Sequence, residues 1–413
     1  MNQWWFFLVR ISRRLIVRAS AYGAAAVLAA LAAVWFAPFV PDELSERLGG
    51  PAVENILSAL ASSLLAVATF SVSAVVVAYT AVSSQFTPRA ASFITTDGAT
   101  QRALATFVGA FLFAVVALVA LGANYYGAAG RTILFLATLL MVALVAVTLL
   151  GWIDRVTRLA HYGHLLSQIE SATRQALDAR MARPFLGGRK LEQPSEKGAF
   201  VSTQSIGYLA NIDPHKLQKL ADKLDCTVEV LVAPGDFVDH EQTLARLPEL
   251  AGLTDEDRAQ IRNAFSFSDG RTFEQDPRYG LEVLVEVAAR ALSPGVNDPR
   301  TAVLATESCY RLLADWARRA GVEDAGEPEC PRIRARALDG CALLQLSLGE
   351  IARYGAADPM VAERVQHTLR ALAEMNGAPF ERCARAAAAT ALARAEAAIA
   401  FKPDLERVRA AGS

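Results

Sequence analysis

Four long stretches without a single charged residue constrain this chain more than any other feature. No Asp, Glu, Lys or Arg lies between Arg18 and Asp42, Glu54 and Arg89, Arg102 and Arg131, or Arg131 and Asp154. A helix needs about 20 consecutive apolar residues to cross the core of a bilayer, where its backbone must satisfy its own hydrogen bonds. The sequence therefore predicts a multi-pass α-helical membrane protein with four spans, near residues 19–40, 56–82, 103–123 and 132–153.

The composition agrees with this prediction and excludes some functions. The 413 residues are 53% hydrophobic and carry a net charge of -1, which argues against a general nucleic-acid binder. The cysteines are odd in number, and no two have CxxC spacing, so we expect reduced thiols, no zinc and no disulfide framework. They are Cys226, Cys309, Cys330, Cys341 and Cys383.

The arginines near the span ends predict the orientation. One side of the predicted membrane has eight: Arg10, Arg13, Arg14, Arg18, Arg89, Arg102, Arg155 and Arg158. The other side has Arg47 and Arg131 beside four acidic residues, Asp42, Glu43, Glu46 and Glu54. Both termini are therefore expected in the cytoplasm. Trp4 to Phe7 indicate an interfacial segment before a retained first helix rather than a cleaved signal peptide.

The second span carries a stripe of hydroxyl side chains. Six residues spaced 4, 7, 4, 7 and 4 apart fall within an arc of about 80° on a helix: Ser58, Ser62, Thr69, Ser73, Thr80 and Ser84. Such a stripe can pack closely against another membrane helix, or it can line a hydrated axis when several copies assemble. Packing is the favoured interpretation, and both can hold in an oligomer.

The rest of the chain divides by pattern into three parts after the transmembrane domain at 1–153. Residues 154–194 are expected to form a juxtamembrane helix, continuous with span four as far as Arg180, and a linker. His161 and His164 lie on one face of this helix, but two further ligands for a metal are not evident, so we expect packing and no metal site. Residues 251–413 have the alanine- and leucine-rich helical period of a bundle, with helix starts at Thr254, Asp298 and Asp358.

Residues 195–250 show strand patterns instead. F-V-S-T-Q-S-I-G-Y-L-A-N-I-D predicts two short strands around a turn at 205–207, followed by a helix capped by Asp213 with Pro214 at its first position. Residues 199–247 resemble half of a biotinyl/lipoyl-type barrel-sandwich domain, through G-Y-L-A-N-I-D and P-G-D-F-V-D-H-E-Q-T-L-A-R-L. The carrier lysine of that family has no counterpart, so the resemblance implies a docking or oligomerisation module without a cofactor.

A dense polar turn, R-A-L-S-P-G-V-N-D-P-R-T-A, lies within the helical part. Ser293-Pro294-Gly295 stops one helix, Asn297 or Asp298 caps the next, and Pro299 fits its first position. A structural turn is the favoured interpretation, and a site for an anionic ligand or a partner is the second. Catalysis ranks last, because a Ser nucleophile needs a base and no histidine lies near in sequence. The candidate residues are Arg290, Ser293, Asn297, Asp298, Arg300 and Thr301.

Several segments together resemble the bacterial membrane-protein family catalogued as domain of unknown function 2254. They include S-S-Q-F-T-P-R-A, F-V-G-A-F-L-F-A, S-I-G-Y-L-A-N-I-D, A-P-G-D-F-V and F-E-Q-D-P-R-Y-G-L-E-V-L-V-E-V-A-A-R-A-L-S-P-G-V-N-D-P-R-T-A. The resemblance implies a multi-span protein of the bacterial inner membrane with a cytoplasmic domain, but no particular activity.

Two functions therefore stay open. The first is an oligomeric, pore-like or transport-associated protein in which span two lines a central axis and the cytoplasmic domain assembles or gates it. The second is a non-conducting, membrane-tethered scaffold or sensor that binds a cytoplasmic protein or a small anionic ligand. Neither is an enzyme, and a membrane-anchored enzyme ranks last because no nucleophile, acid–base pair or metal set is assembled in the sequence. The expected partners are the lipid bilayer and further copies of the chain, without nucleic acid.

Overall fold

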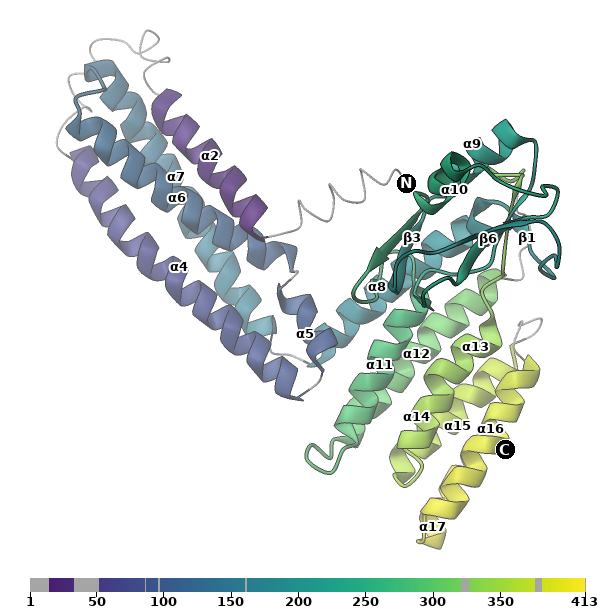
Figure 1. Ribbon diagram of the computed structural model, residues 1–413. Coiled ribbons are helices and arrows are strands. Elements are labelled where there is room, and N and C mark those ends of the chain that lie inside the picture. Colours follow the sequence, from purple (N-terminus) through teal and green to yellow (C-terminus); the bar gives the residue numbers. More distant parts are fainter. Residues whose placement is uncertain are drawn as a thin grey trace. The chain divides into compact units, whose positions relative to one another are not determined.

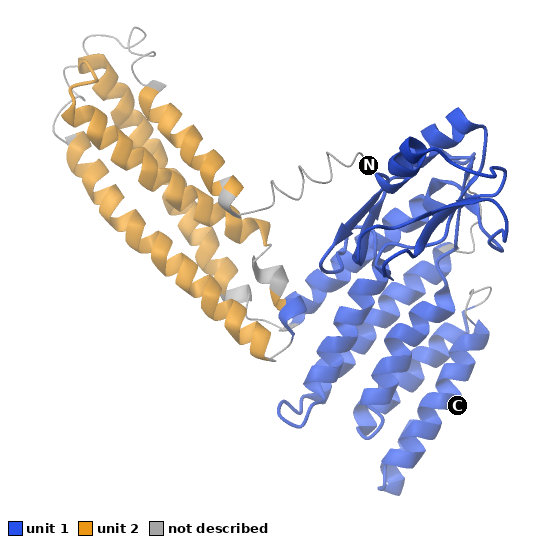
Figure 2. Cartoon of the chain, in the orientation of Figure 1, with its two compact units in different colours: residues 1–3, 85–90, 162–413 blue, residues 4–84, 91–161 orange. Residues whose placement is uncertain are grey.

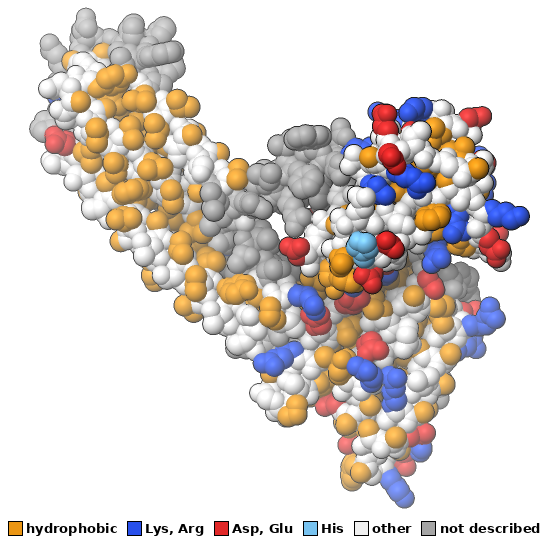
Figure 3. All heavy atoms as spheres, in the orientation of Figure 1, with side chains coloured by type: hydrophobic (Ala, Val, Ile, Leu, Met, Phe, Trp, Pro, Cys, Tyr) orange, Lys and Arg blue, Asp and Glu red, His pale blue; other side chains and the backbone are white. Residues whose placement is uncertain are grey.

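The computed structural model describes residues 15–32, 52–85, 87–95, 97–159, 162–320, 327–375 and 381–412. The chain forms two compact units, which we call the membrane unit (residues 4–84 and 91–161) and the C-terminal unit (residues 1–3, 85–90 and 162–413) (Figure 2). Hydrophobic side chains cover the visible face of the membrane unit, whereas charged side chains are scattered over the C-terminal unit (Figure 3). The two surfaces therefore suit different solvents.

Long helices make up most of the described part of the membrane unit (Figure 1). They are α2 (Leu15–Ala32), α4 (Ala52–Gln85), α6 (Gly98–Gly122) and α7 (Ala128–Leu159). A short helix, α5 (Pro88–Thr95), follows α4. Within the described residues, three segments are long and apolar enough to cross a membrane: Val53–Ser84, Gly98–Gly122 and Ala128–Val156.

The first predicted span, 19–40, differs from the other three. Its described part holds a shorter apolar helix, Ala19–Leu31, and residues 33–51 lie outside the described residues. Most residues on which the predicted orientation rests also lie outside the described residues. They are the tail arginines at 10, 13 and 14, Trp4 to Phe7, and Arg47 with its acidic neighbours in the opposite loop. Glu54 of that loop is described. The predictions for spans two to four agree with the helices found, and a count of four is not established.

Helix α6 forms the centre of the membrane unit. Of the 18 residues in its most apolar stretch, 56% are buried, compared with 11% in the corresponding stretches of α4 and α7. Phe107 and Phe113 of α6 are fully buried, and the hydroxyl of Tyr126 donates a 2.7 Å hydrogen bond to the Ala30 carbonyl of α2. The outer face of α7 stays exposed and apolar, as expected of a helix that faces lipid. The outer face of α4 is exposed as well.

The C-terminal unit contains two small sheets. The strands are β1 (Arg189–Lys190), β2 (Ala199–Ser202), β3 (Gly207–Ile212), β4 (Val228–Val230), β5 (Phe237–Val238), β6 (Thr243–Leu247), β7 (Phe265–Ser268) and β8 (Ile333–Ala335). One sheet has the order β1-β8-β4-β6-β2 and the other β5-β3-β7. The strands β2 and β3 on either side of the predicted turn thus belong to different sheets. Strands β1, β7 and β8 come from outside residues 195–250, and this mixed pairing does not establish a half barrel-sandwich.

Helix α9 (Pro214–Leu224) begins as the sequence predicts. Asp213 accepts a hydrogen bond from the backbone N–H of Lys216, and Pro214 occupies the first turn. The buried side of α9, with Leu217 and Leu220, joins a core formed by both sheets. The helix therefore covers the strands with its apolar face.

The predicted continuation of span four to Arg180 falls on two helices, α7, described as far as Leu159, and α8 (Tyr162–Ala182). Residues 160–161, which include His161, lie outside the described part of the chain, so one continuous helix stays a prediction. Helix α8 packs in the C-terminal unit, where Gly280 allows a close approach: a Cβ at Gly280 would lie 2.7 Å from the Cβ of Thr173. A turn of 3-10 helix, η2 (Pro184–Gly187), follows.

The remaining helices, apart from α10 (Asp255–Arg262), form the bundle of the C-terminal unit (Figure 1). Helix α10 instead packs against α9 and β2. Thr254 and Asp358 each cap a helix with a side-chain oxygen, as predicted. The helices of the bundle are α11 (Pro277–Ala291), α12 (Pro299–Ala320), α13 (Gly340–Leu344), the π-helical turn η3 (Gln345–Gly349), α14 (Glu350–Tyr354), α15 (Pro359–Ala373), α16 (Glu381–Ala398) and α17 (Lys402–Gly412).

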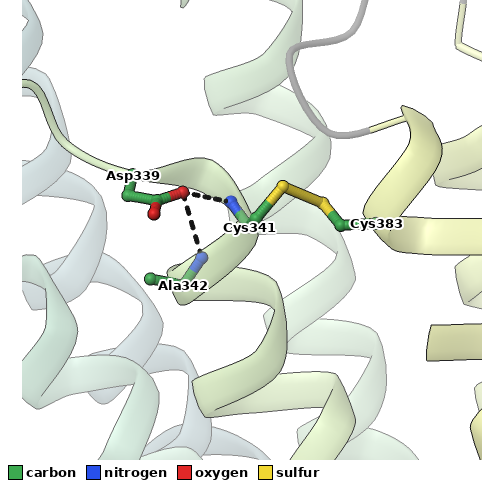
Figure 4. The surroundings of a disulfide bond; sticks show 4 residues. All are labelled: Asp339, Cys341, Ala342 and Cys383. Carbon is green, nitrogen blue, oxygen red and sulfur yellow. Dashed lines mark hydrogen bonds between the residues drawn. A yellow bond between two sulfur atoms is a disulfide. The ribbon is translucent and has the colours of Figure 1, made fainter. Parts of the chain in front are cut away.

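The cysteines correct one prediction. Cys341 of α13 and Cys383 of α16 form a disulfide (Figure 4), whereas we expected reduced thiols throughout. Sequence spacing cannot reveal this pair, because the two residues are 42 apart and are brought together only by the packing of α13 against α16. Cys226, Cys309 and Cys330 are free thiols and buried.

Candidate functional site

The hydroxyl stripe of α4 lies on the surface of the membrane unit. All six residues, Ser58, Ser62, Thr69, Ser73, Thr80 and Ser84, are exposed. The opposite side of the same helix carries its buried residues: Val53, Leu57, Leu60, Leu64, Ser71 and Val82. At 100° per residue, the centres of the two sets are about 180° apart. The stripe therefore points away from the packed interior of its own unit.

The hydroxyls are satisfied locally. Ser62 donates to the carbonyl of Ser58 at 3.0 Å, Ser73 donates to that of Thr69 at 3.0 Å, and Thr80 donates to that of Val76 at 2.8 Å. Each oxygen keeps a free lone pair to accept from water or from another helix. Among the described residues of the membrane unit, no other helix buries these hydroxyls, so the packing favoured from the sequence would need a helix of a second copy. A second copy, water or lipid must cover this face.

The polar turn has the predicted helix–stop–cap–helix form. Helix α11 ends at Ala291, and the Asp298 N–H bonds back to the Ala291 carbonyl at 2.8 Å. Asp298, rather than Asn297, is the cap: its carboxylate accepts from the Thr301 N–H at 3.2 Å and from the Thr301 hydroxyl at 2.6 Å. Asn297 has a φ of 50°, the left-handed conformation that asparagine tolerates.

The other polar side chains of this turn do not converge on one point. Ser293 donates its hydroxyl to the Arg290 carbonyl at 2.7 Å, and the side chains of Arg290 and Arg300 are exposed. The side chains of Asp298 and Thr301 are hydrogen-bonded to each other in the cap. These hydrogen bonds explain the turn as a structural feature. The exposed side chain of Arg300 is the group of the turn that a ligand could contact.

A contact next to this turn was not evident from sequence. Arg89, in the segment that follows α4, forms an ion pair with Glu286 of α11. Residues 85–90 belong to the C-terminal unit, so the end of the stripe-bearing helix continues directly into that unit. The motif S-S-Q-F-T-P-R-A marks the arginine, but its partner lies 197 residues away.

A second ion pair joins two helices inside the membrane unit. Asp97 caps α6, accepting from the Thr100 N–H at 2.8 Å, and its carboxylate also pairs with Arg155 of α7. Burial raises the pKa of Asp97, but the hydrogen bonds from Arg155 and Thr100 outweigh it, so the net pKa lies below the usual 3.8. Asp97 is therefore ionised at neutral pH and ties the start of α6 to the end of α7.

Among the described residues, no group of three or more His, Cys, Asp or Glu side chains has the arrangement of a metal site. His164 instead lies 3.0 Å from the side-chain amide of Gln168, one turn further along α8. Two lysines of α9 also have partners: Lys223 pairs with Asp257 at 3.2 Å, and Lys216 donates to the Asn263 carbonyl at 3.2 Å.

Comparisons with known proteins agree with the membrane helices. Uncharacterized proteins of Mycobacterium tuberculosis (strain H37Rv) and Mycobacterium bovis are each 26% identical over 318 residues, which is 73% of this chain and 60% of theirs. The chain thus spans less than two thirds of the length of the curated relatives it matches. No solved structure matches it. The family model described as "Predicted membrane protein (DUF2254)" matches residues 12–371, and the chain therefore belongs to this family.

Proposed function

We propose that the chain is a non-catalytic, pore-like membrane protein in which several copies assemble with the hydroxyl stripe of α4 facing a common axis. The carrying observation is that the six hydroxyl residues are exposed and about 180° from the buried face of the same helix. A polar stripe on the outer face of an apolar helix is better placed against water or another copy than against lipid.

The exposed residues beside the stripe fit the same assembly. Leu65, Phe70, Val72 and Val77 flank the hydroxyls and are between 49% and 68% exposed in the single chain. In a ring of copies, these side chains would pack against the neighbouring α4 helices while the stripe faced the axis. This arrangement covers an apolar surface and a polar stripe together.

In this proposal the C-terminal unit controls the assembly. The segment after α4 belongs to that unit, and Arg89 pairs with Glu286 of α11. A shift of α11 would therefore be transmitted through this ion pair to the segment that follows α4. In this proposal the strands serve as a docking or oligomerisation module, as their likeness to a barrel-sandwich unit implies.

The proposal also includes the topology. The chain crosses the bacterial inner membrane four times, once for each of the uncharged stretches in the sequence, and both termini lie in the cytoplasm. The arginines at the span ends support this orientation. A reporter enzyme that functions only in the cytoplasm should then be active when it is fused at Ser413.

Cysteine labelling tests the stripe. Ser62→Cys, Thr69→Cys and Ser73→Cys should react with a small, charged, water-soluble thiol reagent in liposomes, whereas Leu140→Cys and Val147→Cys on α7 should not. These two controls are 72% and 71% exposed in the single chain and should face lipid. The unmodified chain is the blank, since its free cysteines are buried. Equal labelling on α4 and α7, or a monomeric mass in detergent, would refute the proposal.

A non-conducting scaffold or sensor is the second candidate, favoured by the exposed Arg300 at the start of α12. It expects inorganic phosphate or an acidic partner to bind at the turn, and Arg300→Gln to abolish that binding without changing the melting temperature. Phosphate binding that survives Arg300→Gln would exclude the turn as the site. Ion flux through liposomes that carry the purified chain would separate the first candidate from the second.

A further inference from the structure

A cavity of about 260 Å³ lies inside the C-terminal unit, between the larger sheet and the helices. Its walls come from the loop after β4, the end of α8, the start of α11 and the segment from β8 to α13. Most of the lining is apolar, including Leu186, Leu231, Val232, Leu338 and Leu343. Neither the hydroxyl stripe nor the polar turn contributes to it.

One cation in this wall has no counter-ion. Arg180, in the last turn of α8, is half-buried, and its guanidinium donates a 3.0 Å hydrogen bond to the Arg336 carbonyl. Throughout the described residues, no carboxylate forms an ion pair with it. A half-buried guanidinium that holds one carbonyl leaves most of its five N–H donors unused.

Of the other charged side chains that line the cavity, that of Arg336 is exposed, whereas Arg278 and both aspartates are engaged. Arg278 donates to Asp236 at 2.8 Å and to the Pro234 carbonyl at 2.7 Å. Asp339 accepts from the backbone N–H groups of Cys341 and Ala342 at the start of α13 (Figure 4). Neither aspartate is free to move to Arg180. Three arginines and two aspartates line the cavity, so its net formal charge is +1.

The surroundings penalise the charge of Arg180. Burial, and then the nearby positive charge of Arg278, lower the pKa of Arg180 from its ordinary value to about 10. The side chain still carries its charge at neutral pH, but the charge is held in an unfavourable place. A bound anion would remove this penalty, because a guanidinium binds a carboxylate through two parallel hydrogen bonds.

We propose that this cavity binds a small carboxylate with an apolar body, whose carboxylate pairs with Arg180 while its hydrocarbon part contacts the leucines of the wall. The apolar lining disfavours inorganic phosphate, which has no group to place there. The volume suits a ligand about the size of a substituted aromatic acid or a short-chain fatty acid. This inference is independent of whether copies assemble around α4.

Binding of benzoate to the full-length protein in lipid nanodiscs tests the proposal by isothermal titration calorimetry. Benzoate should bind and raise the melting temperature, whereas benzamide, its neutral isostere, and inorganic phosphate should not. Arg180→Gln should weaken benzoate binding roughly ten- to hundredfold. Arg382→Gln, which removes an exposed arginine on α16, is the matched control and should bind as the parent does.

The stability of the variant without ligand separates a binding role from a structural one. If Arg180 serves a ligand, Arg180→Gln should melt at the parent temperature or above it, because an unpaired half-buried charge is removed. A lower melting temperature for this variant would show that Arg180 is a structural residue and overturn the proposal. Binding of phosphate alone, or benzoate binding that survives Arg180→Gln, would overturn it as well.

Discussion

The carboxylate of Glu170 on α8 lies 2.6 Å from the guanidinium of Arg311 on α12. The pair is the first of three between these helices. One turn further along both, Arg174 lies 2.6 Å from Asp315, and one turn beyond that Asp178 lies 2.7 Å from Arg319. The two partners in each pair are 141 residues apart in sequence, so the two helices run parallel. Along α8 the charges are negative, positive and negative, and along α12 they are positive, negative and positive.

This ladder holds the first helix after α7 to the bundle. Charges four residues apart lie on one face of a helix, so each helix presents a full row to the other. Glu170 is the most buried of the acids, with 14% of its side chain exposed, and it also pairs with Arg174 at 3.2 Å. It is therefore the residue on which the ladder depends most.

Removing the charge of Glu170 should destabilise the C-terminal unit. Glu170→Gln leaves Arg311 unpaired, and we expect the free energy of unfolding to fall by about 1–2 kcal/mol, since Arg311 is half exposed and its charge is partly screened. Thermal melting followed by tryptophan fluorescence would measure it. Glu381→Gln, which breaks an exposed pair with Arg385 on α16, is the control and should change little.

The contribution of Glu170 should depend on pH. Burial raises its pKa, but hydrogen bonds from Arg311, Ser308 and Arg174 outweigh this, and the net pKa lies below 4.5. A carboxyl group whose pKa is lower in the folded state than in the unfolded state stabilises the fold at pH values above its pKa in the unfolded state. This stabilisation is lost as the pH falls through its pKa in the folded state. The difference in stability between parent and Glu170→Gln should therefore be full at pH 7 and shrink below about pH 4.5. A difference that stayed constant to pH 3 would argue against an ionised pair.

The cap at Asp298 should matter for stability more than for binding. Asp298→Ala removes both hydrogen bonds to Thr301 and should cost about 1 kcal/mol, whereas Asp298→Asn keeps a capping side chain and should cost much less. Melting temperatures of the two variants would show the difference. Equal melting temperatures for parent and Asp298→Ala would instead favour a ligand or partner site at this turn.

The redox state of Cys341 and Cys383 should report on which side of the membrane the C-terminal unit lies. Disulfides persist in oxidising compartments and are rare in the cytosol, so the proposed cytoplasmic location predicts that the pair is reduced in the cell and forms the disulfide after isolation. Acid quenching of cells, alkylation and mass measurement would test this. A pair found oxidised in quenched cells would contradict the orientation inferred from the arginines.

Oxidation of the same pair should stabilise the purified protein. The bond closes a loop of 42 residues, for which chain entropy gives about 4 kcal/mol. Reductant should therefore lower the melting temperature of the parent and leave Cys341→Ser unaffected. An equal shift in both would mean that another cysteine responds.

The membrane helices and the helix starts were predictable because their causes are local. An uncharged stretch and a capping residue act on their immediate neighbours, so spans two to four and the caps at Asp213, Thr254 and Asp358 follow from sequence. The charges of the ladder are also visible as alternation along 154–180, but their partners on α12 are not. Pairing over 141 residues depends on how helices pack, which no local pattern encodes.

The sequence by itself determined where the chain is apolar enough for lipid and where its helices begin, because burial of apolar surface and helix capping depend on residue type and spacing. Only the tertiary structure decided which strands share a sheet, that Cys341 meets Cys383, that the hydroxyl stripe lies opposite the buried face of α4, and that Arg180 lies in a cavity without a counter-ion. Each of these depends on the distance between residues far apart in the chain, and packing alone sets that distance.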